Sequence, residues 1–186
     1  VPVQVQLEAY TPFVPLNPDD SGIPAAVFTY RIHNPNDKPV SLTLVGSMMN
    51  PVGHWDFDPT NGRRDKQLGT SLNQFRAGAG YRGLRFSAAG IEPDALEYGS
   101  VSLVTDHPNI TYKQAWLRGG WWDFLREFWD DLAEDGQLND LGYGDTPHTY
   151  PETGSLGLLD TLAPGATAEY RFVLAWYFPN RLNSWD

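Results

Sequence analysis

The chain has 186 residues, of which 41% are hydrophobic and 13% aromatic, so it is long and apolar enough for one globular domain with a sizeable core. Its formal net charge of -10 argues against nucleic acid and anionic membranes as partners, because both would repel an acidic surface. The absence of cysteine excludes disulfides, thiolate metal sites and a cysteine nucleophile.

No apolar run approaches the ~20 residues that a membrane helix needs, and no signal-peptide pattern is present. We therefore predict a soluble chain without a transmembrane segment. The lack of cysteine leaves the compartment open, and we favour a cytoplasmic location. The strand pattern starts almost at Val1, and the chain ends near Trp185, an aromatic residue that no element accommodates. Both ends are typical of cuts through a longer polypeptide.

Alternating apolar and polar residues predict strands in the first part of the chain. The expected strands cover residues 3–8, residues 25–33 and a segment starting at Val40. The proline-rich residues 11–24 between the first two cannot enter a sheet interior, so they form a loop. Turn residues 34–37 separate the second and third strands, and this short spacing predicts that the two form a hairpin.

The middle of the chain changes its period. Residues 50–66 form a long polar loop, and glycines then punctuate four short strands, expected at residues 71–77, 81–88, 100–105 and 109–116. Apolar residues then follow at helical spacing, namely Trp121, Leu125, Phe128 and Leu132. They predict one helix over about residues 121–135, which Gly136 would terminate.

The last stretch predicts a long strand. After the polar residues 139–153 and a short strand near residues 156–159, Pro164 and Gly165 form a turn. Large side chains then alternate onto one face, at Tyr170, Phe172, Leu174 and Trp176. Pairing should stop near Phe178, because Pro179 cannot donate to a ladder. The whole pattern predicts an all-β fold: a two-sheet antiparallel β-sandwich with one inserted helix, and residues 1–186 as a single domain.

Three segments in order resemble a known family. They are VQVQLEAYTPFVPLNPDDSGIPAAVFTYRIHN at residues 3–34, VGSMMNPVG at residues 45–53 and FVLAWYFPNR at residues 172–181. Together they resemble the N-terminal domain of the family-116 glycoside hydrolases, the group of non-lysosomal glucosylceramidases and bacterial β-glucosidases. The resemblance covers most of the chain and is least clear over residues 60–111.

This resemblance implies a β-sandwich placed before a helical catalytic domain that carries the catalytic acid pair. The chain contains no counterpart of that helical domain, so we assign no catalytic residue. The upstream, glycine-rich part of the family's N-terminal domain is also absent. The resemblance therefore implies a non-catalytic piece of a larger glycosidase, whose partner is the helical catalytic domain of the same polypeptide and whose contact with a glycoside substrate is indirect.

Other constellations favour structural roles. The acids of the predicted helix form a solvated face, at Asp123, Glu127, Asp130, Asp131, Glu134 and Asp135. The acid pairs 19–20 and 56–58 lie in loops, where acids commonly make turns. The four histidines are too far apart for a zinc site. The glycine-containing loop 139–145 offers oxygen ligands but lacks the EF-hand spacing, so we predict neither a metal nor a cofactor.

Tryptophans are the best candidates for contact with a sugar or with another domain, because a pyranose can stack on an indole. Trp116 and Trp121 can be explained by packing in a core. Trp122 points about 100° away from Trp121 on a helix, so it is the better candidate for a domain contact. Trp55 stands in a polar loop and is a further candidate. The candidates for a carbohydrate site or a domain interface are therefore Trp55, Trp116 and Trp122.

Two alternatives remain open beside the accessory domain. An autonomous carbohydrate-binding sandwich would present a row of exposed aromatic side chains on one face. A scaffold domain would have no role in sugar chemistry at all.

Overall fold

The computed structural model describes residues 2–53, 55–57, 64–67 and 69–182, and it describes side chains outside residues 54–68. Its two helices are α1 (Pro18–Ser21) and α2 (Asp123–Asp135). The first six strands are β1 (Gln4–Tyr10), β2 (Ala25–His33), β3 (Val40–Met49), β4 (Trp55–Phe57), β5 (Arg64–Gln67) and β6 (Thr70–Ala77). The remaining strands are β7 (Arg82–Ala89), β8 (Ser100–Thr105), β9 (Ile110–Lys113), β10 (Thr153–Leu162) and β11 (Thr167–Tyr177).

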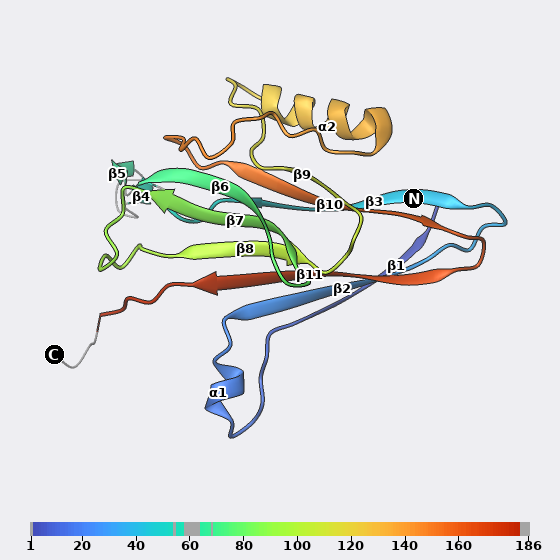
Figure 1. Cartoon of the computed structure of the whole chain (residues 1–186), viewed down its shortest axis with the longest axis horizontal. Helices are drawn as coiled ribbons and strands as arrows, with labels where there is room; N and C mark the ends of the chain where they lie inside the picture. The colour runs from blue at the N-terminus through green and yellow to red at the C-terminus, as the bar shows by residue number, and fades with distance from the viewer. Residues whose placement is uncertain (1, 54, 58–63, 68, 183–186) are drawn as a thin grey trace.

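The strands form two facing antiparallel sheets, as the sequence predicts (Figure 1). The larger sheet has the order β1-β2-β11-β8-β7-β6, and the smaller one has the order β3-β10-β9. β4 and β5 form a separate two-stranded sheet inside the predicted loop 50–66. The described residues contain no helix that is long and apolar enough to cross a membrane.

The predicted hairpin between the second and third strands is wrong. β2 pairs with β1 and β11, whereas β3 pairs with β10 in the other sheet. Asn34 explains the crossing, because its buried side-chain amide donates to the carbonyls of Lys38, Leu162 and Ala163. These bonds tie the chain to the neighbouring corner between β10 and β11, so it passes from one sheet to the other.

The core lies between the two sheets and is made of large apolar side chains. Its fully buried members include Leu84, Phe86, Leu156 and Leu158. β10 approaches β7 closely at Gly154, where an added Cβ would lie 2.8 Å from a methyl group of Leu84. A glycine at this position therefore sets the spacing between the two sheets.

β10 is longer than the predicted strand near residues 156–159, because it also holds the polar residues at both of its ends. β11 ends at Tyr177 as predicted, two residues before Pro179. The apolar face of β11 is buried only in its first half, since Tyr170 and Phe172 are buried whereas Trp176 is exposed. Loop residues 11–24 contain the short helix α1, which Asn17 caps by accepting from the N–H of Asp20.

α2 covers the outer face of the smaller sheet (Figure 1). It begins at Asp123, two residues later than predicted, because Trp121 has a left-handed φ of 55° that cannot continue a helix. It ends as predicted at Gly136, whose left-handed conformation lets its N–H donate to the carbonyl of Leu132.

Candidate functional site

Trp116 lies just after β9 and anchors an aromatic cluster between the smaller sheet and α2. Its ring stacks on Phe128 with the centroids 4.3 Å apart, and it lies 6.1 Å from Phe124. Its indole N–H donates to the hydroxyl of Ser155 on β10 at 2.8 Å. Trp116 is therefore fixed by packing and by a hydrogen bond.

Trp122 joins the same cluster from the outside. It is 70% exposed, and its ring centroid lies 6.1 Å from that of Phe124. Trp121 beside it is 91% exposed. Phe124 thus connects two of the predicted candidates, Trp116 and Trp122. The third, Trp55, begins β4, but its side chain lies outside the described residues.

A pocket of about 520 Å³ opens beside this cluster. Its aromatic and apolar lining includes Met49, Trp116, Phe124 and Tyr150, and its charged or titratable lining is Arg118, His148 and Glu152. The residues come from the end of β3, from the segment before α2 and the first turn of α2, and from the segment that leads into β10. The pocket combines apolar walls with a few polar groups, which is the usual make-up of a small-molecule site.

The polar side of the pocket is an ion pair. The Glu152 carboxylate is only 6% exposed and accepts from the Arg118 Nε at 2.6 Å and from an Arg118 terminal nitrogen at 3.3 Å. The Arg118 guanidinium also lies 4.2 Å from the centre of the Tyr143 ring. The His148 Nδ1 lies 3.7 Å from a Glu152 oxygen, beyond hydrogen-bond distance.

This arrangement contains one carboxylate, which is paired with Arg118. Glycoside hydrolysis with retention or inversion requires two carboxyl groups across the sugar. The described lining of the pocket contains only one of the two carboxyl groups that such hydrolysis needs.

Comparison with known proteins identifies the family. The model of a family described as "beta-glucosidase 2, glycosyl-hydrolase family 116 N-term" matches residues 1–186. The chain belongs to this family-116 N-terminal domain family. It is also similar to a solved structure titled "Putative kojibiose phosphorylase from human microbiome", at 9% identity and a TM-score of 0.43, with 94% of this chain covered. The chain spans about 16% of the length of that protein.

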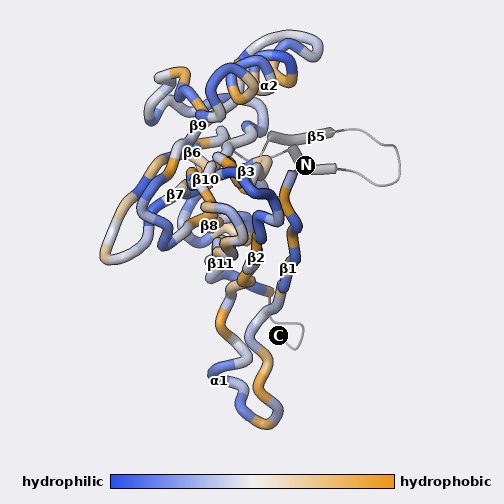
Figure 2. The backbone as a smooth tube through the Cα atoms, turned by 90° about the vertical axis from the view of Figure 1, so that its right-hand side faces the viewer, coloured by the Kyte–Doolittle hydropathy of each residue, from blue (hydrophilic) through white to orange (hydrophobic). Residues whose placement is uncertain are grey.

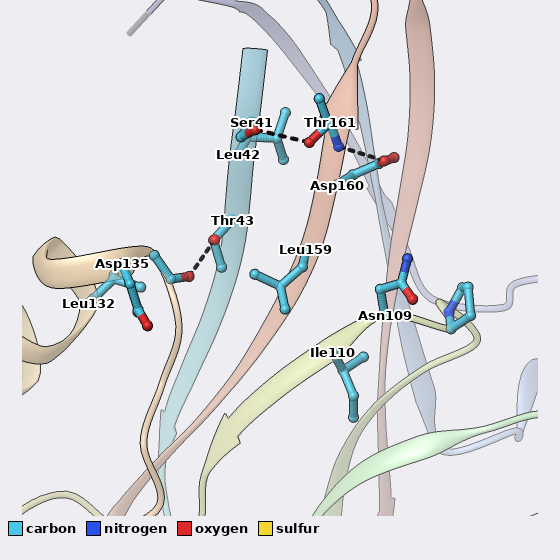
Figure 3. Close-up of a pocket in the computed structure, with 12 residues that line it drawn as sticks. Ser41, Leu42, Thr43, Asn109, Ile110, Leu132, Asp135, Leu159, Asp160 and Thr161 are labelled. Atoms are coloured by element: carbon cyan, nitrogen blue, oxygen red, sulfur yellow. Dashed lines mark hydrogen bonds between the residues drawn. The ribbon is translucent and has the colours of Figure 1, made fainter. Parts of the chain in front are cut away.

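The family-116 domain has a second, larger hollow of about 970 Å³ between the end of α2 and the outer face of β3 and β10 (Figure 3). Its walls are mixed, with apolar side chains such as Ile110 and Leu132 beside polar ones. Ser41 bonds Thr161 across the strands, and Thr43 donates to the carbonyl of Gly136. Asp160 at its rim accepts from the backbone N–H of Thr161 at 2.7 Å and from the Tyr170 hydroxyl at 2.8 Å. Burial and this contact raise the pKa of Tyr170 well above its ordinary value, so the phenol stays neutral.

The helix acids of the family-116 domain do not all form the predicted solvated face. Lys113 of β9 is fully buried and pairs with both Glu127 and Asp131 of α2, at 2.9 Å in the case of Asp131. Burial raises the pKa of Asp131, but donors from Asn139 and Lys113 outweigh it and lower the pKa below the ordinary 3.8. This buried ion pair fastens α2 to the sheet.

The loop over residues 139–145 also has a structural role. The Asp140 carboxylate accepts from the backbone N–H of Gln114 at 2.7 Å and from that of Gly142 at 3.1 Å. Among the described residues, no group of three or more His, Asp or Glu side chains is arranged to hold a metal ion.

Sequence reasoning missed Arg118, His148, Tyr150 and Glu152. Arg118 and Glu152 are 34 residues apart, and neither lies in a periodic segment. A charged pair in two loops leaves no pattern in a single sequence, so only the fold brings these residues together.

Proposed function

We propose that this family-116 domain is a non-catalytic accessory domain that packs on a helical catalytic domain of the same polypeptide and fixes its orientation. One observation carries the proposal: the described pocket holds a single carboxylate clamped by Arg118, while Trp121 and Trp122 beside it stay exposed. Such exposed aromatic residues are typical of a surface that another domain covers.

An activity assay tests the non-catalytic part of the proposal. The chain of residues 1–186 should release no product from an aryl β-glucoside, whereas the complete polypeptide should hydrolyse it. Turnover by the isolated chain would overturn the proposal.

One tryptophan substitution, made in two proteins, tests the packing part. In the complete polypeptide, Trp122→Ala should lower the melting temperature, because it removes a side chain that the catalytic domain covers. The same substitution should leave the isolated chain almost unchanged, since Trp122 is mostly exposed there. Equal effects in both proteins would contradict a domain contact at Trp122.

The second candidate is an autonomous carbohydrate-binding module, which the pocket favours. Tyr150 is exposed at its mouth, and an aromatic face beside polar side chains is suited to a pyranose. Calorimetry with short gluco-oligosaccharides distinguishes the two candidates. Sugar binding that Tyr150→Ala abolishes would support the carbohydrate-binding module. No measurable heat of binding with any of the sugars would argue against it.

A further inference from the structure

α2 covers only part of the outer face of the smaller sheet. The helix ends at Gly136, whose carbonyl accepts from the Thr43 hydroxyl of β3. The hollow of about 970 Å³ begins at this contact and extends over Ser41 and Thr161, toward the start of β3 and the end of β10 (Figure 3). We call it the outer-face hollow. It is separate from the pocket beside Trp116, since the two share no described lining residue.

The floor of the outer-face hollow combines hydroxyl groups with one aliphatic side chain. In the register of the smaller sheet, Thr161 stands opposite Ser41, and Leu159 stands opposite Thr43. Directly opposed residues in an antiparallel pair point to the same face, and so do residues two positions apart along a strand. Because Thr43 bonds to the end of α2, all four side chains lie on the outer face.

Asn109, just before β9, brings a side-chain amide to the same hollow. Figure 3 shows it on the opposite side of Leu159 from Asp135. Its main-chain carbonyl accepts from the N–H of Leu159 at 3.0 Å, which fixes the residue beside β10. Its side chain is exposed, and no described residue forms a hydrogen bond with the amide. The amide therefore offers two donors and one acceptor to a ligand.

The hydroxyl groups of the floor also keep unused bonding capacity. The hydroxyl oxygens of Ser41 and Thr161 lie 2.9 Å apart, so one hydroxyl donates and the other accepts. The proton of the accepting hydroxyl is then available to a ligand. The Thr43 hydroxyl donates to Gly136, so its lone pairs remain as acceptors. The hollow thus presents neutral donors and neutral acceptors together.

The charged groups at the outer-face hollow argue against an ionic ligand. Its described lining contains no Lys, Arg or His, so an anion would find no opposite charge. Its two carboxylates already accept from the domain itself. Asp135 accepts from the N–H of Gln137 at 2.8 Å, and Asp160 accepts from Thr161 and Tyr170. The groups that stay unpaired are an amide and hydroxyls, which match a neutral ligand.

We propose that the outer-face hollow binds a neutral oligosaccharide, with Asn109 and the hydroxyls of Ser41 and Thr161 bonded to sugar hydroxyls and Leu159 against a pyranose face. Sugar hydroxyls donate and accept, as these protein groups do, and the C–H groups of a pyranose face are apolar and suit an aliphatic side chain. The volume of about 970 Å³ is near the upper end of the range of ~300–1,000 Å³ that holds drug-sized ligands, so more than one sugar residue fits.

Titration of residues 1–186 with cellotriose and with maltotriose, followed by the NMR signals of the backbone amides, tests the site without any activity measurement. We expect one of the two sugars to cause saturable shifts of the amides of Ser41, Asn109 and Leu159, because these residues line the hollow. No saturable shift at these amides with either sugar would overturn the proposal. So would shifts confined to the pocket beside Trp116.

Two alanine variants serve as a matched pair in the same titration. Asn109→Ala should weaken sugar binding about tenfold, because it removes the free amide, and it should fold, because the side chain is exposed. Tyr150→Ala alters the pocket beside Trp116 and should leave the affinity unchanged. Weaker binding in Tyr150→Ala alone would place the sugar in that pocket and refute the outer-face hollow as the site. Neither result depends on the accessory role of the domain, which the glucoside assay and Trp122→Ala test separately.

Discussion

At the scale of single residues, Lys113 is a buried charge whose stability depends on its ion-pair partners. Its ammonium group is fully buried and has two carboxylate partners, Glu127 and Asp131, on one side of α2. The exposed pair of Arg126 and Asp130 on the same helix differs, since both of its members are solvated. Removing one partner of a buried ion pair lowers the free energy of unfolding much more than removing one partner of a surface pair.

Lys113→Met should destabilise the domain by about 3–5 kcal/mol, because it leaves two partly buried carboxylates facing each other without their cation. Urea unfolding monitored by tryptophan fluorescence would measure the loss. Combining it with Glu127→Leu and Asp131→Leu should recover most of the stability, since an apolar cluster can replace a buried pair. Arg126→Ala is the control and should cost less than about 0.5 kcal/mol. A loss from Lys113→Met no larger than that of the control would contradict the assignment.

The same ion pair predicts how stability depends on pH. Because the pKa of Asp131 is lowered in the folded state, its contribution is present above the ordinary value of 3.8 and is lost as the pH falls through the lowered pKa. The free energy of unfolding should therefore fall more steeply as the pH drops below about 4 in the unmodified chain than in Asp131→Asn. Parallel pH profiles of the two proteins would show that Asp131 has no such role.

The ion-pair partners of the helix acids could not be predicted from the sequence. The charge run on the helix predicts solvation, and it is correct for Asp130 but wrong for Glu127 and Asp131. The decisive partner is a lysine on β9, and no spacing in the sequence connects that strand to the helix. The Arg118–Glu152 pair was missed for the same reason.

At the scale of elements, the stability of α2 depends on the backbone conformation at its C-terminal end as well as on its contacts with the sheet. Gly136 adopts a φ of 79°, and its position beside Thr43 leaves 3.2 Å to an added Cβ. Gly120, before the helix, has open space around it and no left-handed φ. The two glycines therefore form a natural comparison.

Gly136→Ala should cost about 1 kcal/mol, because a Cβ is strained in the left-handed conformation. Gly120→Ala should change stability by no more than about 0.5 kcal/mol. Thermal unfolding of both variants measures the difference. Equal melting temperatures would show that the helix end adapts without strain.

Elements with a strong period could be predicted from the sequence, whereas their connections could not. β6, β7, β8 and α2 follow their apolar patterns closely, whereas β9 ends at Lys113 and is shorter than the expected strand over residues 109–116. The link from β2 to β3 has ordinary turn residues, but a hairpin and a crossing between sheets share that chemistry. The buried amide of Asn34 decides between them, and it does so through carbonyls more than 100 residues away.

At the scale of the whole molecule, one segment projects from the sandwich. The arm, residues 11–24, extends beyond the sheet edge at β1 and β2 and carries apolar residues (Figure 2). Leu16 at its tip is fully exposed and has a left-handed φ of 64°. The Ser21 hydroxyl bonds both the N–H and the carbonyl of Val14 at 2.9 Å. The arm thus holds its shape by itself and presents Leu16 outward, which is suited to insertion into a partner domain.

Leu16→Asn tests whether this arm contacts the catalytic domain that we propose. In residues 1–186 the variant should be as stable as the original chain or slightly more stable, because asparagine tolerates a left-handed φ better than leucine. In the complete polypeptide it should weaken the packing of the two domains by about 2 kcal/mol, the scale of a central interface residue. Calorimetric unfolding of both proteins would measure this. Leu96→Asn, at an exposed leucine between β7 and β8, is the control and should affect neither protein. If Leu16→Asn leaves the complete polypeptide unchanged, the arm does not contribute to the domain interface, and the exposed tryptophans before α2 remain the surface to test.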